Sequence, residues 1–251
     1  MSKNPTRNRA RRSSAEAAPH GPLWLWGAHA VAAARANPRR TTHRLVATDN
    51  AARRLNLGEA EILTAKELDR LTPPGAVHQG VAVRTDPLEA IALEDLLAGA
   101  ATRVAVLDQL ADPHNLGAVF RSAAAFGFDA IILQTRHSPP LTGVVAKAAA
   151  GAIETVAECR VVNIARTLEA LADAGWRTVG LDGAGEASIA DAVAGDDKTA
   201  IVLGAEGQGL RPAVAAACGV LARIQIAPVM ESLNVSNAAA IAFYETARGS
   251  F

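Results

Sequence analysis

The 251-residue sequence contains little cysteine and few aromatic residues: two Cys, three Trp, one Tyr and five Phe. Cys159 and Cys218 lack a CxxC spacing and a neighbouring His cluster, so the sequence predicts neither a disulfide framework nor a metal site. We expect both to be small buried hydrophobic residues. No apolar stretch approaches the roughly 20 residues that span a bilayer, and residues 1–21 lack the apolar segment of a secretory signal. A cytoplasmic protein without a membrane partner is therefore expected.

The net charge of zero conceals an uneven distribution along the chain. Residues 1–54 hold eleven Lys and Arg against two acids, a net charge of +9, whereas residues 55–251 hold fourteen against twenty-three, a net charge of −9. A basic segment of this kind predicts contact with a polyanion. Residues 1–20 are rich in Arg, Ser and Asn without recurring apolar positions, which indicates a disordered basic tail. Arg39, Arg40 and Arg44 lie in sequence that is typical of folded structure and are the better candidates for that contact.

Apolar periodicity divides the rest of the chain into two units. Residues 21–85 predict a small α/β domain, with helices at 25–37 and 51–56 and strands at 42–48 and 80–85. The acidic, Ala-rich segment 86–102 is interpreted as a linker. In residues 103–251 short β-branched segments alternate with helical ones, and strands are predicted at 104–108, 130–133, 176–182, 199–204 and 222–227. This alternation predicts an α/β fold with a mainly parallel sheet covered on both faces, whose ligands bind at the carboxyl ends of the strands.

The first polar loop of the second unit is "DQLADPHNLGAVFRS", which follows the predicted strand at 104–108. Asn115 stands at the start of a predicted helix, where it is either a simple N-cap or a ligand contact. Arg121 lies six residues further on amid Ala, Val and Phe, where a charge needs a partner or a ligand. A structural ion pair is the alternative role for Arg121. His114 is interpreted as a hydrogen-bonding bystander.

Two further polar loops follow predicted strands. In "LGAEGQGL" three glycines surround a single carboxylate, Glu206, and glycine permits positive φ and close approach of backbone to a ligand. The glycine order fits neither a P-loop nor a dinucleotide fingerprint, and a plain turn is the alternative. The third loop, "SLNVS" at 232–236, precedes a charge-free segment, 238–244. Side chains and free N–H groups at such a helix start can hold a polar or anionic ligand, and the apolar helix is expected to be buried or in an interface.

A fourth segment, "VGLDGAGEAS", imitates the beginning of a Rossmann dinucleotide site. Gly183 and Gly185 follow a strand, but Ser188 occupies the third glycine position. We interpret this segment as an ordinary loop, although it leaves an oxidoreductase as one alternative function.

Taken together, the three loops resemble the motifs of the TrmH-type members of the SPOUT class of RNA ribose 2'-O-methyltransferases. The matching residues are Asn115, Gly117, Arg121, Ser122 and Gly127 in the first, Gly204, Glu206, Gly207 and Gly209 in the second, and Ser232, Leu233, Asn234, Ser236 and Glu245 in the third. "KAAAGAIETV", "WGAHAV" and "HQGVAV" extend the resemblance over roughly residues 24–251. The last two favour the branch that methylates a guanosine of large-subunit (23S) ribosomal RNA. A transfer-RNA substrate and a non-catalytic RNA-binding module are the alternatives.

The resemblance implies a trefoil-knotted catalytic domain over 103–251, a homodimer formed through it, and S-adenosylmethionine as cofactor. It implies catalytic roles for Arg121, Asn115, Glu206, Ser232 and Asn234, and cofactor contacts from Leu203, Gly204, Ile224, Ile226, Leu233 and Ser236. The domain at 21–85 would bind the RNA substrate through Arg39, Arg40 and Arg44. The sequence departs from the family after Ile224, where the loop from Gln225 to Pro228 loses one backbone N–H at the proline.

Overall fold

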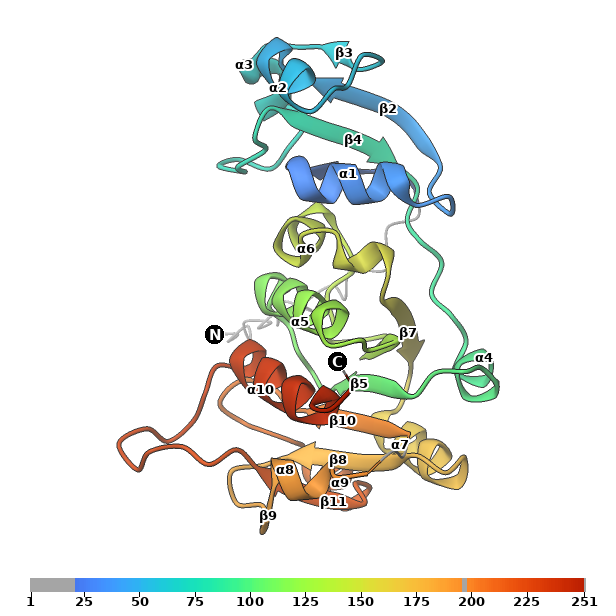
Figure 1. Cartoon of the computed structure of the whole chain (residues 1–251), viewed down its shortest axis with the longest axis vertical. Helices are drawn as coiled ribbons and strands as arrows, with labels where there is room; N and C mark the ends of the chain where they lie inside the picture. Colours follow the sequence, from blue (N-terminus) through green and yellow to red (C-terminus); the bar gives the residue numbers. More distant parts are fainter. Residues whose placement is uncertain (1–20, 196–197, 251) are drawn as a thin grey trace, which may run out of the picture.

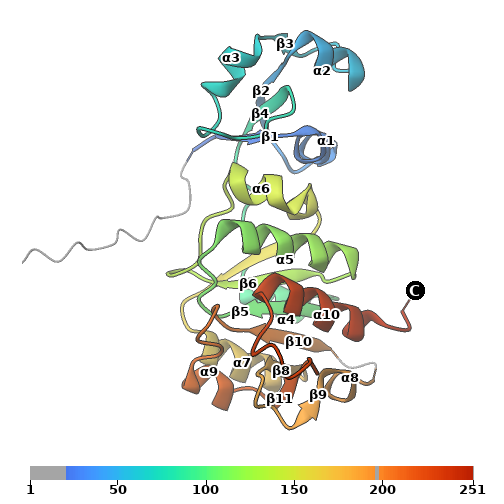
Figure 2. The ribbon, with the colours of Figure 1, turned by 90° about the vertical axis from the view of Figure 1, so that its left-hand side faces the viewer.

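The computed structural model describes residues 21–195 and 198–250, and the predicted basic tail at 1–20 lies outside them. A small N-terminal unit stacks on the end of a larger sheet domain along the long axis of the molecule (Figures 1 and 2). Within the described residues, no helix has both the length and the apolar character needed to cross a membrane.

The N-terminal unit is a four-stranded mixed sheet with three short helices. In the order β1-β4-β2-β3, strand β4 is antiparallel to both of its neighbours, and β3 is parallel to β2. The strands are β1 (Leu23–Trp26), β2 (Thr42–Ala47), β3 (Glu61–Ile62) and β4 (Val81–Thr85), and the helices are α1 (Ala28–Ala36), α2 (Asp49–Arg54) and α3 (Ala65–Asp69). The helix predicted at 25–37 starts later because Leu23–Trp26 pairs with β4 and Gly27 turns the chain at a φ of 90°.

The second unit contains a seven-stranded sheet in the order β7-β6-β5-β10-β8-β11-β9, and every adjacent pair is parallel. The strands are β5 (Arg103–Leu107), β6 (Ala130–Gln134), β7 (Ala157–Val161), β8 (Arg177–Leu181), β9 (Ala187–Ser188), β10 (Thr199–Leu203) and β11 (Val220–Arg223). Strand β10 is buried along its whole length, as expected of a strand covered on both faces. The predicted α/β fold with a mainly parallel sheet is confirmed; β7 and β9 were not predicted.

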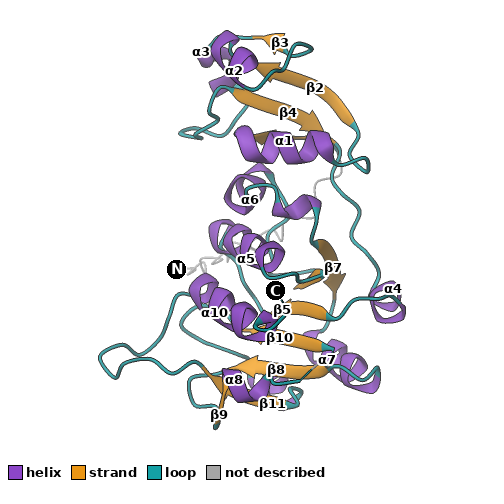
Figure 3. Ribbon diagram, in the orientation of Figure 1, coloured by secondary structure: helices purple, strands orange, loops and turns teal. Residues whose placement is uncertain are grey.

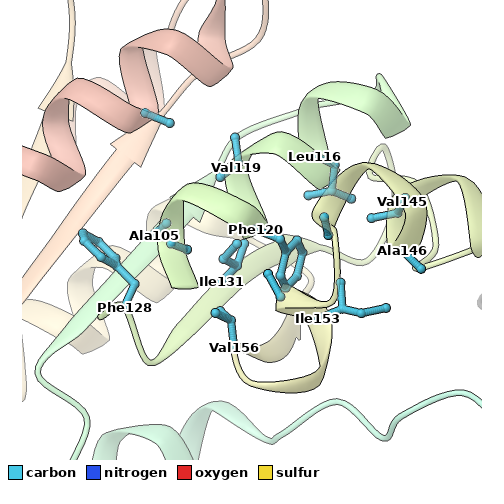
Figure 4. Close-up of a cluster of buried hydrophobic side chains, with 14 of the residues drawn as sticks. Ala105, Leu116, Val119, Phe120, Phe128, Ile131, Val145, Ala146, Ile153 and Val156 are labelled. Carbon is cyan, nitrogen blue, oxygen red and sulfur yellow. The ribbon is translucent and has the colours of Figure 1, made fainter. Parts of the chain in front are cut away.

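Helices cover both faces of this sheet (Figure 3). One core gathers side chains from α5 (Pro113–Ala125), α6 (Gly143–Ala149), α8 (Ile189–Ala192) and α10 (Val235–Ala247), with a short 3-10 helix at Ala152–Glu154 beside them. The other core gathers α4 (Leu93–Ala98), α7 (Ile164–Asp173) and α9 (Pro212–Ala216). Figure 4 shows part of the first core, where Phe120 of α5 lies among apolar side chains of the sheet and of α6.

The second half of the predicted linker packs against the sheet domain. The backbone N–H of Ile91 donates to the carbonyl of Glu158 at 2.8 Å, and Ile91 bridges to Cys159 in parallel. Leu96 of α4 is buried in the second core. Residues 91–98 therefore cover strand β7, because their apolar side chains pack against the second core.

The two units are docked through α6, which packs on β1. A Cβ at Gly143 would lie 2.0 Å from the Trp26 ring, so only glycine permits this approach. Beside it, Arg40 of the small unit pairs with Glu154 of the sheet domain at 2.8 Å, and both side chains are only 4% exposed. Arg40 was expected to contact RNA; because its guanidinium is buried and paired, we exclude it from any RNA surface.

The apolar helix α10 is buried along one side in the single chain. Val235, Ala239 and Phe243 face the core, whereas Ile241 is 37% exposed and Tyr244 is 49% exposed. The Tyr244 ring also makes an edge contact with Phe126 at the end of α5. The helix is thus buried on one face within the single chain, and an apolar face remains open, so the prediction that it is buried or in an interface is met on one face only.

Of the two cysteines, Cys159 is fully buried and Cys218 is partly buried, and both are free thiols. Burial raises the pKa of each thiol to about 11, which keeps both protonated at neutral pH. Their predicted role as small hydrophobic residues fits these positions.

Candidate active site at the carboxyl edge of the sheet

The first loop leaves β5 and enters α5 through an N-cap one turn earlier than expected. Asp112 caps the helix by accepting from the backbone N–H of His114 at 2.9 Å, and Pro113 occupies the first helical position. Asn115 is therefore not the N-cap; its side-chain amide donates to Asp112 Oδ2 at 3.2 Å and also reaches across to the second loop. His114 lies exposed next to the cap.

The three predicted loops meet at one carboxylate. Glu206 Oε1 accepts hydrogen bonds from the side-chain amides of Asn115 and Asn234, the latter at 3.1 Å. The amide of Asn234 also donates to Asn115 Oδ1 at 3.2 Å. Loops that follow β5, β10 and β11 are thus joined in a single polar cluster, which we call the Asn-Glu-Asn cluster.

The third loop holds its asparagine by both ends of the side-chain amide. Asn234 is the N-cap of α10, and its Oδ1 accepts from the backbone N–H of Ser236 at 2.9 Å and from the Ser236 hydroxyl at 2.6 Å. Because the oxygen is engaged at the helix start, the NH₂ group points toward Glu206. The spacing of Asn234 and Ser236 thereby fixes the orientation of the cluster.

A cavity of about 380 Å³ lies beside this cluster. Seven of the residues predicted from the sequence line it: Leu203, Gly204, Glu206, Ile224, Ile226, Ser232 and Leu233. Gly204 is required because a Cβ there would lie 2.1 Å from the backbone of Gly209, where the loop folds back on itself. Apolar side chains, glycine backbone and a carboxylate together form a pocket suited to a small ligand with both apolar and charged parts.

The loop after β8, which the sequence presented as an imitation of a Rossmann motif, also lines this cavity. Leu181, Asp182 and Gly183 lie on its wall, and Asp182 accepts from the backbone N–H of Ala184 at 2.8 Å. We missed these residues because the glycine spacing was judged against a dinucleotide fingerprint. Their place at the carboxyl end of a strand was the signal that could have found them.

An ion pair between a buried carboxylate and a partly exposed arginine supports the second loop. Asp108, at the end of β5, is fully buried, and Arg211 donates to it from Nε at 3.0 Å and from Nη2 at 2.6 Å. The hydrogen bond to Asp108 raises the pKa of Arg211. Because Arg211 ends the glycine-rich segment, this pair fastens that loop to the strand that precedes the first loop. It was also missed from the sequence.

Arg121 does not join the cluster within one chain. It lies on α5 six residues after Asn115, about 240° around the helix at 3.6 residues per turn. Its side chain is exposed and makes no hydrogen bond or ion pair with any described residue. The alternative role of Arg121, a structural ion pair, therefore finds no support among the described residues.

The remaining predicted residues lie away from the cavity. Arg39 donates to the backbone carbonyl of Glu154 at 3.1 Å, and Arg44 forms an exposed pair with Glu61 at 2.8 Å. Both stand in the N-terminal unit. Among residues 21–195 and 198–250, no group of His, Cys, Asp or Glu has an arrangement that could hold a metal ion.

Fold and site together define an α/β protein with a ligand cavity at the carboxyl edge of a parallel sheet, closed by polar loops. Residues 102–244 match the model of the SpoU rRNA Methylase family, and the chain belongs to this family. The predicted resemblance to TrmH-type proteins is confirmed at this level.

Known relatives agree with this placement. A protein of Mycobacterium tuberculosis (strain H37Ra) named as an uncharacterized tRNA/rRNA methyltransferase is 40% identical over 192 residues, 75% of this chain and 59% of that protein. The chain therefore spans less than two thirds of the length of such relatives. AviRb, a SpoU methyltransferase from Streptomyces viridochromogenes solved with AdoMet, shares the fold with a TM-score of 0.76 at 21% identity, covering 92% of this chain and 91% of its own. A structure concerned with 2-OH methylation of C/U34 on tRNA has a TM-score of 0.50 at 29% identity, covering 60% and 97%.

Proposed function

We propose that this chain transfers a methyl group from S-adenosylmethionine to a ribose 2'-hydroxyl of RNA, and that its substrate is a guanosine of large-subunit (23S) ribosomal RNA. The observation that carries the proposal is the Asn-Glu-Asn cluster, which joins the three family motifs beside one cavity. Family membership and the AdoMet complex of AviRb support it.

The cavity fits such a cofactor. Leu203, Ile224 and Leu233 offer apolar surface to the adenosine part, while Ser232 and Glu206 offer polar atoms to the amino-acid part. A carboxylate near the sulfonium favours the cationic cofactor electrostatically. The loop from Gln225 to Pro228 can supply fewer backbone donors than a loop without proline, so affinity rests mainly on the cavity walls.

Bound S-adenosylmethionine supplies a methyl group on a cationic sulfur; the transfer breaks its C–S bond, forms an O–C bond and releases the hydroxyl proton. The residues of this chain contribute orientation. Asn115 and Asn234 fix the Glu206 carboxylate, and the apolar walls confine the cofactor beside it. Holding the two reactants in line supplies a large part of the acceleration in reactions of this kind.

Arg121 acts, in this proposal, on the cavity of the partner in a homodimer. It points away from the cluster of its own chain, and α10 presents the exposed apolar side chains Ile241 and Tyr244 as a surface for a second copy. A guanidinium stays protonated to above about pH 12. We therefore assign Arg121 the task of stabilising the developing alkoxide and a nearby phosphate, with the proton leaving to water. The trefoil knot implied by the family remains a prediction.

The proposal is tested by incubating the chain with radiolabelled S-adenosylmethionine and an unmodified transcript of large-subunit ribosomal RNA. Nuclease digestion followed by mass spectrometry identifies the labelled nucleoside. We expect 2'-O-methylguanosine at one position. Label on a base, or no label on any RNA, contradicts the assignment.

A transfer-RNA substrate is the second candidate, favoured by the structural similarity to a protein studied for tRNA methylation. An unmodified tRNA pool in the same assay separates the two. Label in tRNA with none in ribosomal RNA would retain the chemistry and change the substrate.

A further inference from the structure

The "HQG" motif before β4 shapes a second pocket, far from the cofactor cavity. The backbone there is unusual: Gln79 has a φ of 56° and Gly80 a φ of 79°. A Cβ at Gly80 would lie 2.6 Å from Thr48 Oγ1, so the loop lies tightly against the start of α2. His78 fixes its shape by accepting from the backbone N–H of Gly80 at 2.9 Å through Nδ1. Non-glycine residues seldom adopt positive φ, and such strain collects at binding sites.

Gln79 links the two units through its side-chain oxygen. That oxygen accepts from the backbone N–H of Ala28 at 3.0 Å and from Lys147 Nζ of α6 at 2.8 Å. Its backbone carbonyl accepts from Arg54 Nη2 at 3.2 Å. Two cations, one from each unit, therefore converge on the same glutamine.

These two cations differ from most arginines of the N-terminal unit. Arg35, Arg40, Arg44 and Arg53 each pair with a carboxylate. Arg54 and Lys147 form no ion pair with any residue in the described part of the chain and bond only to the neutral Gln79. Partial burial lowers the pKa of Lys147, so its charged form gains from a nearby anion.

Arg54 and Gln79 line a pocket of about 530 Å³, a size typical of ligand sites, and Lys147 lies next to it, bonded to Gln79. Its lining combines an apolar floor with a polar and basic rim: Ala28, Ala51, Ala65 and Gly80 on the floor, and Thr48, Asn50, Arg54, His78 and Gln79 around it. An apolar floor suits the flat face of a nucleobase, and an unpaired arginine at the rim suits a phosphate. The loop before β4 and the loops of the cofactor cavity lie on the same side of the molecule, at the left in Figure 1 and toward the viewer in Figure 2.

We propose that the pocket formed by α2, the "HQG" loop and the first residues of α1 and α3, with Lys147 of α6 next to it, holds one unpaired nucleotide of the RNA substrate. Its base rests on the alanine floor, and its phosphates contact Arg54 and Lys147. The inference rests on the proposed function and assigns RNA contact to residues other than Arg39, Arg40 and Arg44. It places RNA recognition at the junction of the two units, so that the small unit positions the RNA for the cavity below.

The test measures binding of an unmodified large-subunit ribosomal RNA transcript by filter retention at several KCl concentrations. Arg54→Gln and Lys147→Gln should each weaken binding several-fold and reduce the slope of log K against log[KCl] by about 0.7 to 0.9, the value for one lost phosphate contact. Ala65 is exposed and lines the pocket, so Ala65→Trp should fill the pocket with an indole ring. This variant should weaken RNA binding without changing the salt slope, because it removes no charge. Arg53→Gln is the matched control, because the neighbouring Arg53 is exposed and already paired with Asp49.

Melting temperature and S-adenosylmethionine affinity are measured for every variant and should equal those of the unaltered chain. The proposal of a nucleotide pocket is contradicted when all three variants, Arg54→Gln, Lys147→Gln and Ala65→Trp, bind RNA as tightly as the unaltered chain. Filter retention measures RNA binding, which depends on the pocket whether or not a methyl group is transferred. Loss of methyl transfer alone therefore counts against the proposed function and not against this inference.

Discussion

Two carboxylates, Glu154 between the units and Glu206 at the edge of the sheet, are held in opposite ways. Glu154 is buried and accepts from the guanidinium of Arg40 and from the amide of Asn37 at 2.7 Å. Glu206 is exposed and is held by two neutral amides, with no cation beside it among the described residues. A buried carboxylate that is paired with a cation holds two parts of the fold together. A carboxylate that is oriented by neutral amides and has no cation beside it can attract a cationic ligand. The same residue type thus joins the two units at Glu154 and, in the proposed function, serves the cofactor cavity at Glu206.

The largest effect is expected when the buried pair is broken. Arg40→Met should leave Glu154 buried without its cation, which costs about 3 to 5 kcal/mol of unfolding free energy. For a chain of this size the melting temperature should fall by about 6 to 20 °C. Thermal unfolding by circular dichroism measures this, and Arg53→Met is the exposed control. A melting temperature within 1 or 2 °C of the parent, by the same relation, would show that the pair does not hold the units together.

Replacing the arginine assigned to the transition state should affect rate and leave folding unchanged. Arg121→Ala is expected to lower kcat by about 10²- to 10³-fold, the effect typical of losing one stabilising donor. Because Arg121 is exposed and unpaired, its melting temperature should not change. Arg121→Lys keeps the charge without the planar fork and should recover only part of the rate. Full activity in Arg121→Ala would remove this residue from the mechanism.

A substitution at Asn234 separates its two roles. Asn234→Ser keeps a side-chain oxygen to cap α10 but loses the amide that donates to Glu206, whereas Asn234→Ala loses both. We expect Asn234→Ala to cost about 1 kcal/mol of stability and Asn234→Ser only a few tenths. Both should lose activity to a similar extent. Urea denaturation and initial rates provide the two measurements, and an active Asn234→Ser would show that the cluster is only structural.

The smallest effect is expected at the exposed pair of Arg44 and Glu61. The hydrogen bond from Arg44 lowers the pKa of Glu61 below its usual value. Because the pKa of Glu61 is lower in the folded protein than in the unfolded chain, the pair stabilises the fold at any pH above the pKa of the unfolded state. This stability is lost as the pH falls through the pKa of the folded state. Arg44→Gln should therefore show a barely measurable deficit in melting temperature at pH 7 that disappears in acid. A deficit that grows on acidification contradicts the pairing.

Local patterns in the sequence were sufficient for the parallel sheet, and the resemblance to the TrmH-type motifs supplied seven residues of the cavity lining. Strand ends are visible as polar residues after β-branched runs, and parallel strands bring those ends to one edge, as Asn115, Glu206 and Asn234 show. The ion pairs of Arg40 and Arg211 were not visible because each joins segments about a hundred residues apart. The short strand β1 was hidden because its pairing with β4 overrides a helical periodicity that continues into α1. For Arg121, apolar neighbours in sequence suggested burial, but they face the other side of the helix.

We propose that three loops build a cavity for S-adenosylmethionine, and calorimetric titration of the full chain with that cofactor and with NAD tests this proposal. We expect saturable heat with S-adenosylmethionine, none with NAD, unchanged binding in Arg121→Ala, and loss of binding in Leu233→Trp, which fills the cavity. Heat with NAD alone, or S-adenosylmethionine bound equally well by Leu233→Trp, would contradict the claim.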